Sequence, residues 1–450
     1  MDRLMALTRE LCEIKSGIVC DENEILFRRI SQEIPLDIFR YNSGKEHNGW
    51  IIPDKWTVEE AKVFFDGDLI YDGAINALGV AQYSESFEGE VDLDTLKKHI
   101  FSIPSLPDAH VFHCNWLYRP WEKNWGLCPP HRIVESLKPG KYKVSLKTIF
   151  EPGEMLVGHH HIKGKSDSTV VFQSNTCHPH MANDGFAGTA VMIRFFQWLA
   201  ARDNYYSYRL VLCPEHLGTI FYLRDHTPEE MNLYLAGVFG EMMGTEGDIV
   251  IASSFEGNEL IDRAFRHVAA HTTPNHRFLG FRESVGNDET VWEAPGYEIP
   301  FVQVNRFATH SQPFWGYHTN YDNFDLIQPH LLEEFLKLFK DVVKLLENNV
   351  VMQRKFDGLI ALSNPKYDIY MERFDPSKSI VGDSSFSNKW GLLQDSIVRY
   401  FDGNMNILDI SEKHDLSFFE VREYVQKFVD KDLVNIVLDE IPRRSVKRVN

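Results

Sequence analysis

The stretch that decides the fold is residues 169–201, TVVFQSNTCHPHMANDGFAGTAVMIRFFQWLAA. It opens with a short apolar run at 169–174 that is typical of a buried strand, and it closes with a longer apolar run at 188–201 of helical length. Between them lies a polar loop. A strand that leads through a loop into a helix is the repeating unit of an α/β fold, whose sites form beyond the carboxyl ends of the strands.

The same alternation continues on both sides of this stretch. Further strand-like runs occur at 143–148, 208–213, 233–239 and 299–304. Helix-like runs occur at 217–225 and 258–271, and a long closing helix is expected at 329–349. Strands that alternate with helices predict an α/β domain with a mostly parallel, mixed sheet and helices on both faces.

The ends of the chain differ from this α/β pattern and predict further domains. Residues 1–40 contain two amphipathic helical segments, and we assign them with 131–365 to one catalytic domain. Residues 41–130 are rich in aromatic residues, His and Pro, and indicate a small β-rich inserted domain. Residues 375–450 read as helix, short helix, helix and strand, the order of a winged helix-turn-helix.

Composition narrows the class of protein. The 450 residues carry a formal net charge of -18, which argues against binding to a nucleic-acid backbone. The six cysteines form no CxxC pair, which is typical of reduced thiols in a cytoplasmic protein. We see neither a signal peptide nor an apolar run long enough to cross a membrane. The inserted or the C-terminal domain would be the surface for a homo-oligomer.

Polar side chains follow each of four predicted strands. The residues with metal-ligand chemistry at these strand ends are His178, Asp184, Glu215, His216, Glu241 and His318. Imidazole nitrogens and carboxylate oxygens are the ligands that zinc prefers in catalytic sites. Two such ions can share a bridging carboxylate and activate a water, with a further carboxylate as general base. The sequence therefore predicts a metal-dependent hydrolase.

Four motifs carry a family resemblance: NTCHPHMANDGFAG (175–188), CPEHLG (213–218), GEMMG (240–244) and GYHTNYDNFDLI (316–327). Their order resembles that of di-zinc aminopeptidases of the co-catalytic exopeptidase clan. The chain most resembles an aminopeptidase-like family of bacterial proteins associated with polysaccharide biosynthesis, whose members have a small inserted domain and a C-terminal winged helix. The resemblance covers essentially the whole chain.

This resemblance implies roles for the motif residues. His178 and Glu241 would hold one metal, His216 and His318 the other, and Asp184 would bridge them. Glu215 would be the general base. Two zinc ions are expected, with a single ion as the alternative. The sequence departs from the clan where His216 replaces a Glu, where Glu241 replaces an Asp, and where His180 stands in place of an Asp that orients the first ligand.

Four further residues are candidates for substrate binding, each with a structural alternative. Asp288 and Glu289 would bind a substrate amine or cap a helix, with equal weight. Arg306 would pair with a substrate carboxylate or form a structural ion pair, the commoner case. Tyr317 would wall the pocket or pack beneath its loop. The run His159–His160–His161 is interpreted as a solvated strand end, because neighbours on a strand point to opposite faces.

The main functional hypothesis is an aminopeptidase that cleaves a small peptide or amide substrate. Two alternatives stay open: a deacylase or amidohydrolase that acts on an amino-sugar-type small molecule, and a non-catalytic metal-binding regulator or scaffold. Glutaminyl-cyclase-like chemistry on the same fold is a minor alternative.

Overall fold

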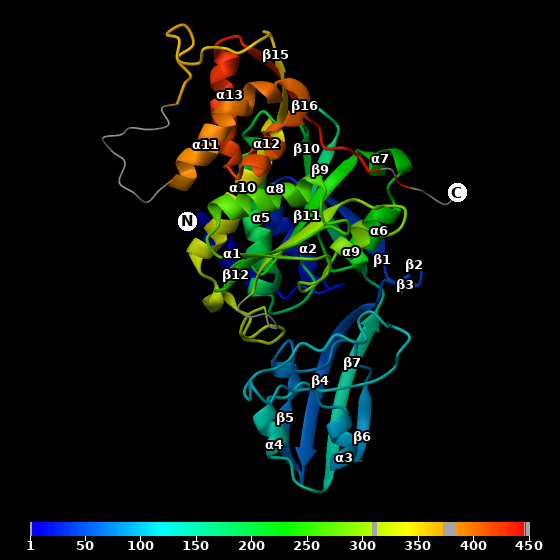
Figure 1. The fold of residues 1–450 in the computed structure, drawn as a ribbon. Helices are drawn as coiled ribbons and strands as arrows, with labels where there is room; N and C mark the ends of the chain where they lie inside the picture. The colour runs from blue at the N-terminus through cyan, green and yellow to red at the C-terminus, as the bar shows by residue number, and fades with distance from the viewer. Residues whose placement is uncertain (1, 308–312, 372–383, 445, 447–450) are drawn as a thin grey trace. The chain divides into compact units, whose positions relative to one another are not determined.

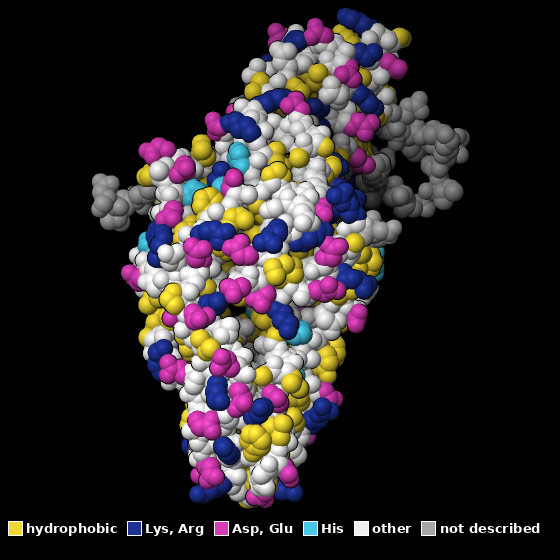
Figure 2. All heavy atoms as spheres, turned by 180° about the vertical axis from the view of Figure 1, so that it is seen from behind, with side chains coloured by type: hydrophobic (Ala, Val, Ile, Leu, Met, Phe, Trp, Pro, Cys, Tyr) yellow, Lys and Arg dark blue, Asp and Glu magenta, His cyan; other side chains and the backbone are white. Residues whose placement is uncertain are grey.

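The computed structural model describes residues 2–307, 313–371, 384–444 and 446. The chain forms two compact units, one of residues 1–257, 277–336 and 444–450 and the other of residues 258–276 and 337–443. No helix in the described ranges is both long and apolar enough to cross a membrane. On the face drawn in Figure 2, acidic and basic side chains are interspersed.

The first unit is built around an eight-stranded mixed sheet. Its strands, in spatial order, are β1 (Asp37–Asn42), β8 (Glu154–Ile162), β10 (Ser207–Cys213), β9 (Thr169–Asn175), β11 (Tyr234–Gly240), β14 (Phe301–Phe307), β12 (Asp248–Ala252) and β13 (His276–Leu279). Strands β9, β10, β11 and β12 of this sheet are labelled in Figure 1. The four central strands β10, β9, β11 and β14 are parallel, whereas β8 and β12 pair antiparallel with their inner neighbours. The predicted strand ends therefore meet at one edge of the sheet.

Helices cover both faces of this sheet, as two neighbouring residues of β8 demonstrate. A Cβ atom on Gly158 would collide with Phe27 of α2 (Glu22–Ser31). The next residue, His159, contacts Tyr222 of α6 (Leu217–Arg224) through a 2.9 Å hydrogen bond. Because neighbouring strand residues face opposite sides, α2 and α6 lie on opposite faces. The predicted two-sided α/β fold is confirmed.

The remaining elements of this part of the chain are short or belong to the layers around the sheet. They are α1 (Asp2–Cys12), the π-helix η2 (Ala182–Phe186), α5 (Ala187–Ala200), α7 (Pro228–Leu233), α9 (Glu289–Trp292) and the 3₁₀ turn η3 (Phe324–Leu326). All seven residues of β9, β11 and β14 are buried. Continuous burial of parallel strands explains why their sequences read as unbroken apolar runs.

Residues from the aromatic-rich segment form a second, four-stranded sheet of order β5-β4-β7-β6. Its elements are β4 (Lys55–Phe65), β5 (Asp68–Asp72), η1 (Gly73–Ile75), β6 (Phe87–Asp92), α3 (Leu93–Lys98), α4 (His131–Glu135) and β7 (Lys141–Glu151), and β2 (Glu46–His47) pairs separately with β3 (Trp50–Ile51). The strand expected at 143–148 forms, but it lies in this sheet, paired with β4 along its length. Its apolar residues, such as Val144, belong to a separate core with Trp125 and Tyr142.

In its described residues the second unit combines helices with a three-stranded sheet of order β16-β15-β17. Its elements are α8 (Leu260–Thr272), α10 (Pro329–Asn348), β15 (Val350–Arg354), α11 (Ser384–Ser396), η4 (Ile397–Tyr400), β16 (Asp402–Asn406), α12 (Ile407–His414), α13 (Phe418–Asp430) and β17 (Val434–Leu438). Helices and a strand occur in the predicted order from 384 onward. The winged-helix interpretation stays a prediction, and residues 375–383 of that predicted domain lie outside the described residues.

Candidate metal centre

Asp184 lies on a single π-helical turn, η2, that joins β9 to α5. Isolated π turns are rare and occur frequently at functional sites. Both oxygens of the buried Asp322 carboxylate accept backbone N–H groups of this turn, from Asn183 at 2.7 Å and from Asp184 at 3.0 Å. Gly188 lets α5 approach the end of β11, because a Cβ atom there would lie 2.8 Å from the carbonyl oxygen of Gly240. Asp184 is thereby fixed at the end of the sheet.

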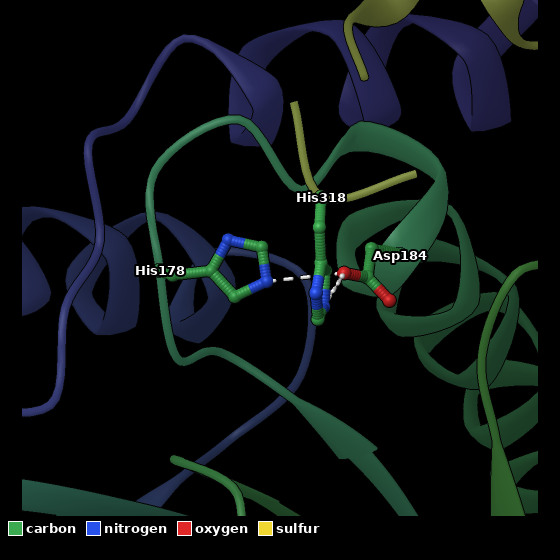
Figure 3. A group of neighbouring side chains, drawn as sticks. All are labelled: His178, Asp184 and His318. Carbon is green, nitrogen blue, oxygen red and sulfur yellow. Dashed lines mark hydrogen bonds and ion pairs between the residues drawn. The ribbon is translucent and has the colours of Figure 1, made fainter. Parts of the chain in front are cut away.

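Two histidines point at the same oxygen of Asp184 (Figure 3). Nε2 of His178 lies 3.1 Å from Oδ2 of Asp184, and Nε2 of His318 lies 3.3 Å from it. One ligand atom from each of the three residues lies within 4.8 Å of the others, as in a site for a metal ion. Burial alone would raise the pKa of Asp184, but the two imidazoles outweigh it and lower that pKa below its usual range.

His178 is oriented by its own loop. Its Nδ1 lies 2.9 Å from the carbonyl oxygen of Pro179, so Nδ1–H donates there and Nε2 keeps its lone pair. The ring of Phe112 stacks on the imidazole with a centroid distance of 4.1 Å. The orienting carboxylate expected two residues after His178 is absent, since His180 occupies that position, and a backbone carbonyl orients the ring instead.

His216 is oriented by a carboxylate. Its Nδ1 lies 2.8 Å from Oδ1 of Asp288, whose side chain is fully buried. The other oxygen of Asp288 accepts hydrogen bonds from Thr219 at 2.8 Å and from Gln173. Burial lowers the pKa of His216, but the hydrogen bond to Asp288 outweighs this effect and raises it overall. Asp288 thus acts through His216, a role that neither sequence interpretation of Asp288 anticipated.

The backbone at His216 has an unusual conformation. Its φ and ψ angles are 54° and -62°, and the N–H of Leu217 donates to the carbonyl oxygen of Glu215 at 2.7 Å. These features define a classic γ-turn, which is rare and strained. Strain of this kind costs on the order of 1–3 kcal/mol and persists where the surroundings hold it. Here Asp288 also accepts the backbone N–H of His216, at 2.6 Å.

Glu215 lies beside this histidine. Its Oε1 is 3.6 Å from Nε2 of His216. Burial raises the pKa of Glu215 to about 7, with further contributions from the charges of Asp288 and Asp184, whereas His216 opposes the rise. A carboxyl group whose pKa lies near neutrality is suited to exchanging protons at physiological pH.

Glu241 follows β11 and is almost completely buried. Its two carboxylate oxygens accept hydrogen bonds from Asn287 at 3.1 Å and from Gln303 at 3.0 Å. Each oxygen retains a lone pair for a further partner. Burial, followed by the charges of Asp184 and Glu215, raises the pKa of Glu241 well above its usual range. Neither Glu241 nor His216 belongs to the group of three ligand atoms within 4.8 Å.

The site concentrates buried negative charge. Five of its carboxylates are buried: Asp184, Glu241, Asp288, Glu289 and Asp322. Arg282 lies 3.8 Å from Glu289, and His178 and His318 both contact Asp184. Unpaired buried charge is costly, and bound divalent cations compensate it. The donor set of imidazoles and carboxylates therefore fits a metal centre.

Of the remaining candidate residues, Tyr317 borders the metal site, whereas Arg306 and Glu289 form hydrogen bonds within the protein. Tyr317 stacks on His318, with a centroid distance of 3.9 Å, and so borders the site. Arg306 bonds to Glu334 and to the carbonyl oxygen of Gly247, both at 2.7 Å, as the structural alternative predicted. Glu289 is buried and accepts the backbone N–H of Asn287.

The run His159–His160–His161 does not converge on a site. His159 contacts Tyr222, and the ring of His160 lies 6.0 Å from that of Phe196, so the two rings face opposite sides of the sheet as predicted. The prediction that these three histidines form a solvated strand end is only partly correct. His159 and His160 are half-buried, whereas His161 is exposed.

Sequence reasoning assigned no role to several residues that shape the site. Asp322 is part of the quoted motif GYHTNYDNFDLI, and its position four residues after His318 was a usable signal. Phe112, Trp50 and Tyr118 come from the 41–130 segment, and the rings of Trp50 and Tyr118 both lie 6.2 Å from that of His216. No sequence pattern linked that segment to the metal ligands.

The fold is that of the zinc aminopeptidases. A zinc aminopeptidase of Bacillus subtilis aligns with a TM-score of 0.58 at 14% identity, over 76% of this chain and 93% of that one. An aminopeptidase of an Aneurinibacillus strain aligns with a TM-score of 0.55 at 11% identity, over 76% of this chain and 93% of that one.

Residues 5–349 match the family described as Domain of unknown function (DUF4910), and the chain belongs to that family. It is 25% identical, over 91% of its length and 90% of the relative's, to a Clostridium acetobutylicum protein named for polysaccharide biosynthesis and for an aminopeptidase-like domain. A crystal structure of a candidate peptidase from C. acetobutylicum aligns with a TM-score of 0.79 at 24% identity, over 97% of this chain and 96% of that one. The predicted family resemblance is thereby confirmed.

Proposed function

We propose that this protein is a zinc-dependent aminopeptidase that hydrolyses the amide bond after the first residue of a small peptide. The observation that carries the proposal is the convergence of His178 and His318 on one oxygen of Asp184 at the end of a zinc-aminopeptidase fold. In this proposal Asp184 would be a ligand shared by two zinc ions, His178 and Glu241 would hold one of them, and His216 and His318 would hold the other.

The hydrogen bonds of the proposed ligands support this assignment. Nδ1 of His178 donates to the carbonyl oxygen of Pro179 and Nδ1 of His216 donates to Asp288, which leaves the lone pair of each Nε2 available to a metal. The amide groups of Asn287 and Gln303 donate to the two oxygens of Glu241 and orient its carboxylate, and a bound cation would favour the ionised form that binds metal. When bound, a zinc pair supplies a water of lowered pKa and polarises the substrate carbonyl.

The protein's own residues carry the proton. Glu215 is the proposed general base, because its carboxyl group lies beside His216 and its pKa is raised to about 7. It accepts the proton of the attacking water and then delivers it to the nitrogen of the leaving peptide. A single carboxyl group thus acts first as the general base and then as the general acid. Phe112 stacks on His178 and Tyr317 stacks on His318, so both rings border the proposed metal ligands.

The decisive test compares the purified protein with Glu215→Gln. We expect about two zinc ions per chain in both, by elemental analysis, and hydrolysis of aminoacyl p-nitroanilides only by the unaltered protein. The rate should fall by at least about 10²-fold, the usual contribution of general-base catalysis. Bound zinc without any turnover would favour a regulator or scaffold, and turnover of acylated amino sugars alone would favour a deacylase.

A further inference from the structure

A hollow of about 540 Å³ lies beside Glu215 and His216. Its other walls come from two loops of the 41–130 segment, around residues 48–50 and 114–121. Three of the lining side chains are the aromatic rings of Trp50, Tyr118 and Trp121. A pocket of this volume is within the range that accommodates small ligands.

Two of these rings form a continuous wall next to the proposed metal ligand His216. The rings of Trp50 and Tyr118 lie 6.4 Å apart in a T-shaped arrangement, and each lies 6.2 Å from the His216 ring. The phenol of Tyr118 and the indole of Trp50 carry no charge at neutral pH. The wall therefore presents uncharged aromatic surface.

Trp121 lines the same pocket and is 59% exposed. An apolar ring packed on this indole would remove apolar area of both partners from water, which favours binding. The cation of the pocket, Arg119, is paired with Glu122 at 3.2 Å. The chemistry of the pocket therefore suits an uncharged, flat apolar group.

We propose that this pocket binds the side chain of the substrate's first residue and selects an aromatic one, as in phenylalanine, tyrosine or tryptophan. The inference rests on the proposed aminopeptidase function. That side chain is attached one carbon away from the carbonyl that is attacked, so its subsite must border Glu215, as this pocket does. A sugar would need partners for hydroxyls around its whole ring, whereas the uncharged polar side chains here are mainly the two amides of Asn48 and Asn115.

The first experiment measures kcat/KM for p-nitroanilides of phenylalanine and alanine. The unaltered protein should prefer phenylalanine by at least about tenfold, the discrimination that a well-packed apolar subsite provides. Trp121→Ala should reduce this ratio about tenfold, and Trp121→Phe, which keeps a ring, should preserve most of it. Leu69→Ala, a matched removal of an exposed apolar side chain on β5, should leave the ratio unchanged.

The second experiment measures binding without turnover. Calorimetric titration of the metal-loaded Glu215→Gln protein should show at least about tenfold tighter binding of Phe-Ala than of Ala-Ala, and the added Trp121→Ala change should remove the difference. Equal affinities, no binding of either dipeptide, or displacement of Phe-Ala by N-acetylglucosamine would overturn the proposal.

The two experiments separate this inference from the proposed function. Hydrolysis without a preference for aromatic residues would contradict the assignment of the pocket but would leave the proposed aminopeptidase function supported. Preferential binding of Phe-Ala without hydrolysis by the unaltered protein would support the pocket and contradict the catalytic assignment.

Discussion

Nδ1 of His216 lies 2.8 Å from a carboxylate oxygen of Asp288, a residue 72 positions further along the chain. Since the same oxygen also accepts the backbone N–H of His216 at 2.6 Å, Asp288 fixes both the ring and the backbone of the proposed ligand. Asp288 is fully buried, and Thr219 and Gln173 satisfy its second oxygen.

Asp288→Asn should reduce zinc affinity or kcat/KM by about 10–100-fold, the usual effect of losing a group that orients a metal ligand. Asparagine lacks the negative charge that supports the His216 ring. Its amide nitrogen also faces a donor in either orientation: Gln173 if the amide oxygen keeps both contacts with His216, or the backbone N–H of His216 if the amide is reversed. Zinc affinity is measured by competition with a chromogenic chelator. Asp341→Asn, a change of another buried carboxylate on α10, is the control and should not alter zinc affinity.

Removal of metal should destabilise the protein. The buried carboxylates around Asp184 repel each other when no cation is bound, and a ligand present at 100 times its Kd adds about 2.7 kcal/mol to the free energy of unfolding. Treatment with EDTA should therefore lower the thermal midpoint by several degrees, and added zinc should restore it. Asp184→Asn should respond to neither treatment. An identical midpoint with and without chelator in the unaltered protein would contradict a metal at this site.

Asp322→Asn should destabilise the turn that carries Asp184. The two Asp322 oxygens accept the N–H groups of Asn183 and Asp184, and an amide nitrogen in place of one oxygen leaves a buried donor unsatisfied. The expected cost is about 1–3 kcal/mol in the free energy of unfolding, measured by urea denaturation. Asp325→Asn, an exposed change in the same segment, is the control. A similar loss in both variants would show that the effect is not specific to the turn.

His267 should make the stability of the second unit depend on pH. Burial lowers its pKa to about 4, with the nearby charge of His271 as the next cause, and its Nε2 accepts the N–H of Phe418 at 3.0 Å. The unfolded chain, in which a histidine has a pKa near 6.5, binds the proton first. The stabilising contribution of His267 is therefore present above about pH 6.5 and is lost as the pH falls toward 4.

The test is to compare the pH dependence of urea denaturation for the unaltered protein and His267→Gln, which keeps an acceptor but does not titrate. The loss between pH 6.5 and 4 should be up to about 2 kcal/mol after allowance for partial solvent screening, and His267→Gln should abolish it. His271→Gln, a change of the exposed histidine one turn along the same helix, should retain most of the dependence.

The sequence contained enough information to predict the central sheet and the convergence of three of the proposed ligands. Apolar runs such as 169–174 and 208–213 became buried parallel strands, because burial on both faces requires continuous apolar sequence. The polar residues that follow them meet at one edge of the sheet for topological reasons. His178, Asp184 and His318 were brought together in this way.

What the sequence did not reveal depends on contacts between distant segments. The pairing of β7 with β4 placed a predicted α/β strand in another sheet, because strand pairing is not encoded by local apolar patterns. The carbonyl of Pro179 as the partner of His178 depends on the path of the loop and leaves no trace in residue type. The position of Asp288 beneath His216 required the fold of the intervening chain.

The γ-turn at His216 limits whether the segment CPEHLG can be transferred to another protein with its geometry intact. The dipeptide Glu215–His216 cannot reproduce its geometry by itself, because the conformation of its histidine is held by a carboxylate supplied from elsewhere. Grafting CPEHLG onto another α/β scaffold should therefore yield a relaxed loop unless the counterpart of Asp288 is grafted with it. Genome searches that require both segments should likewise separate true equivalents from chance occurrences of a glutamate followed by a histidine.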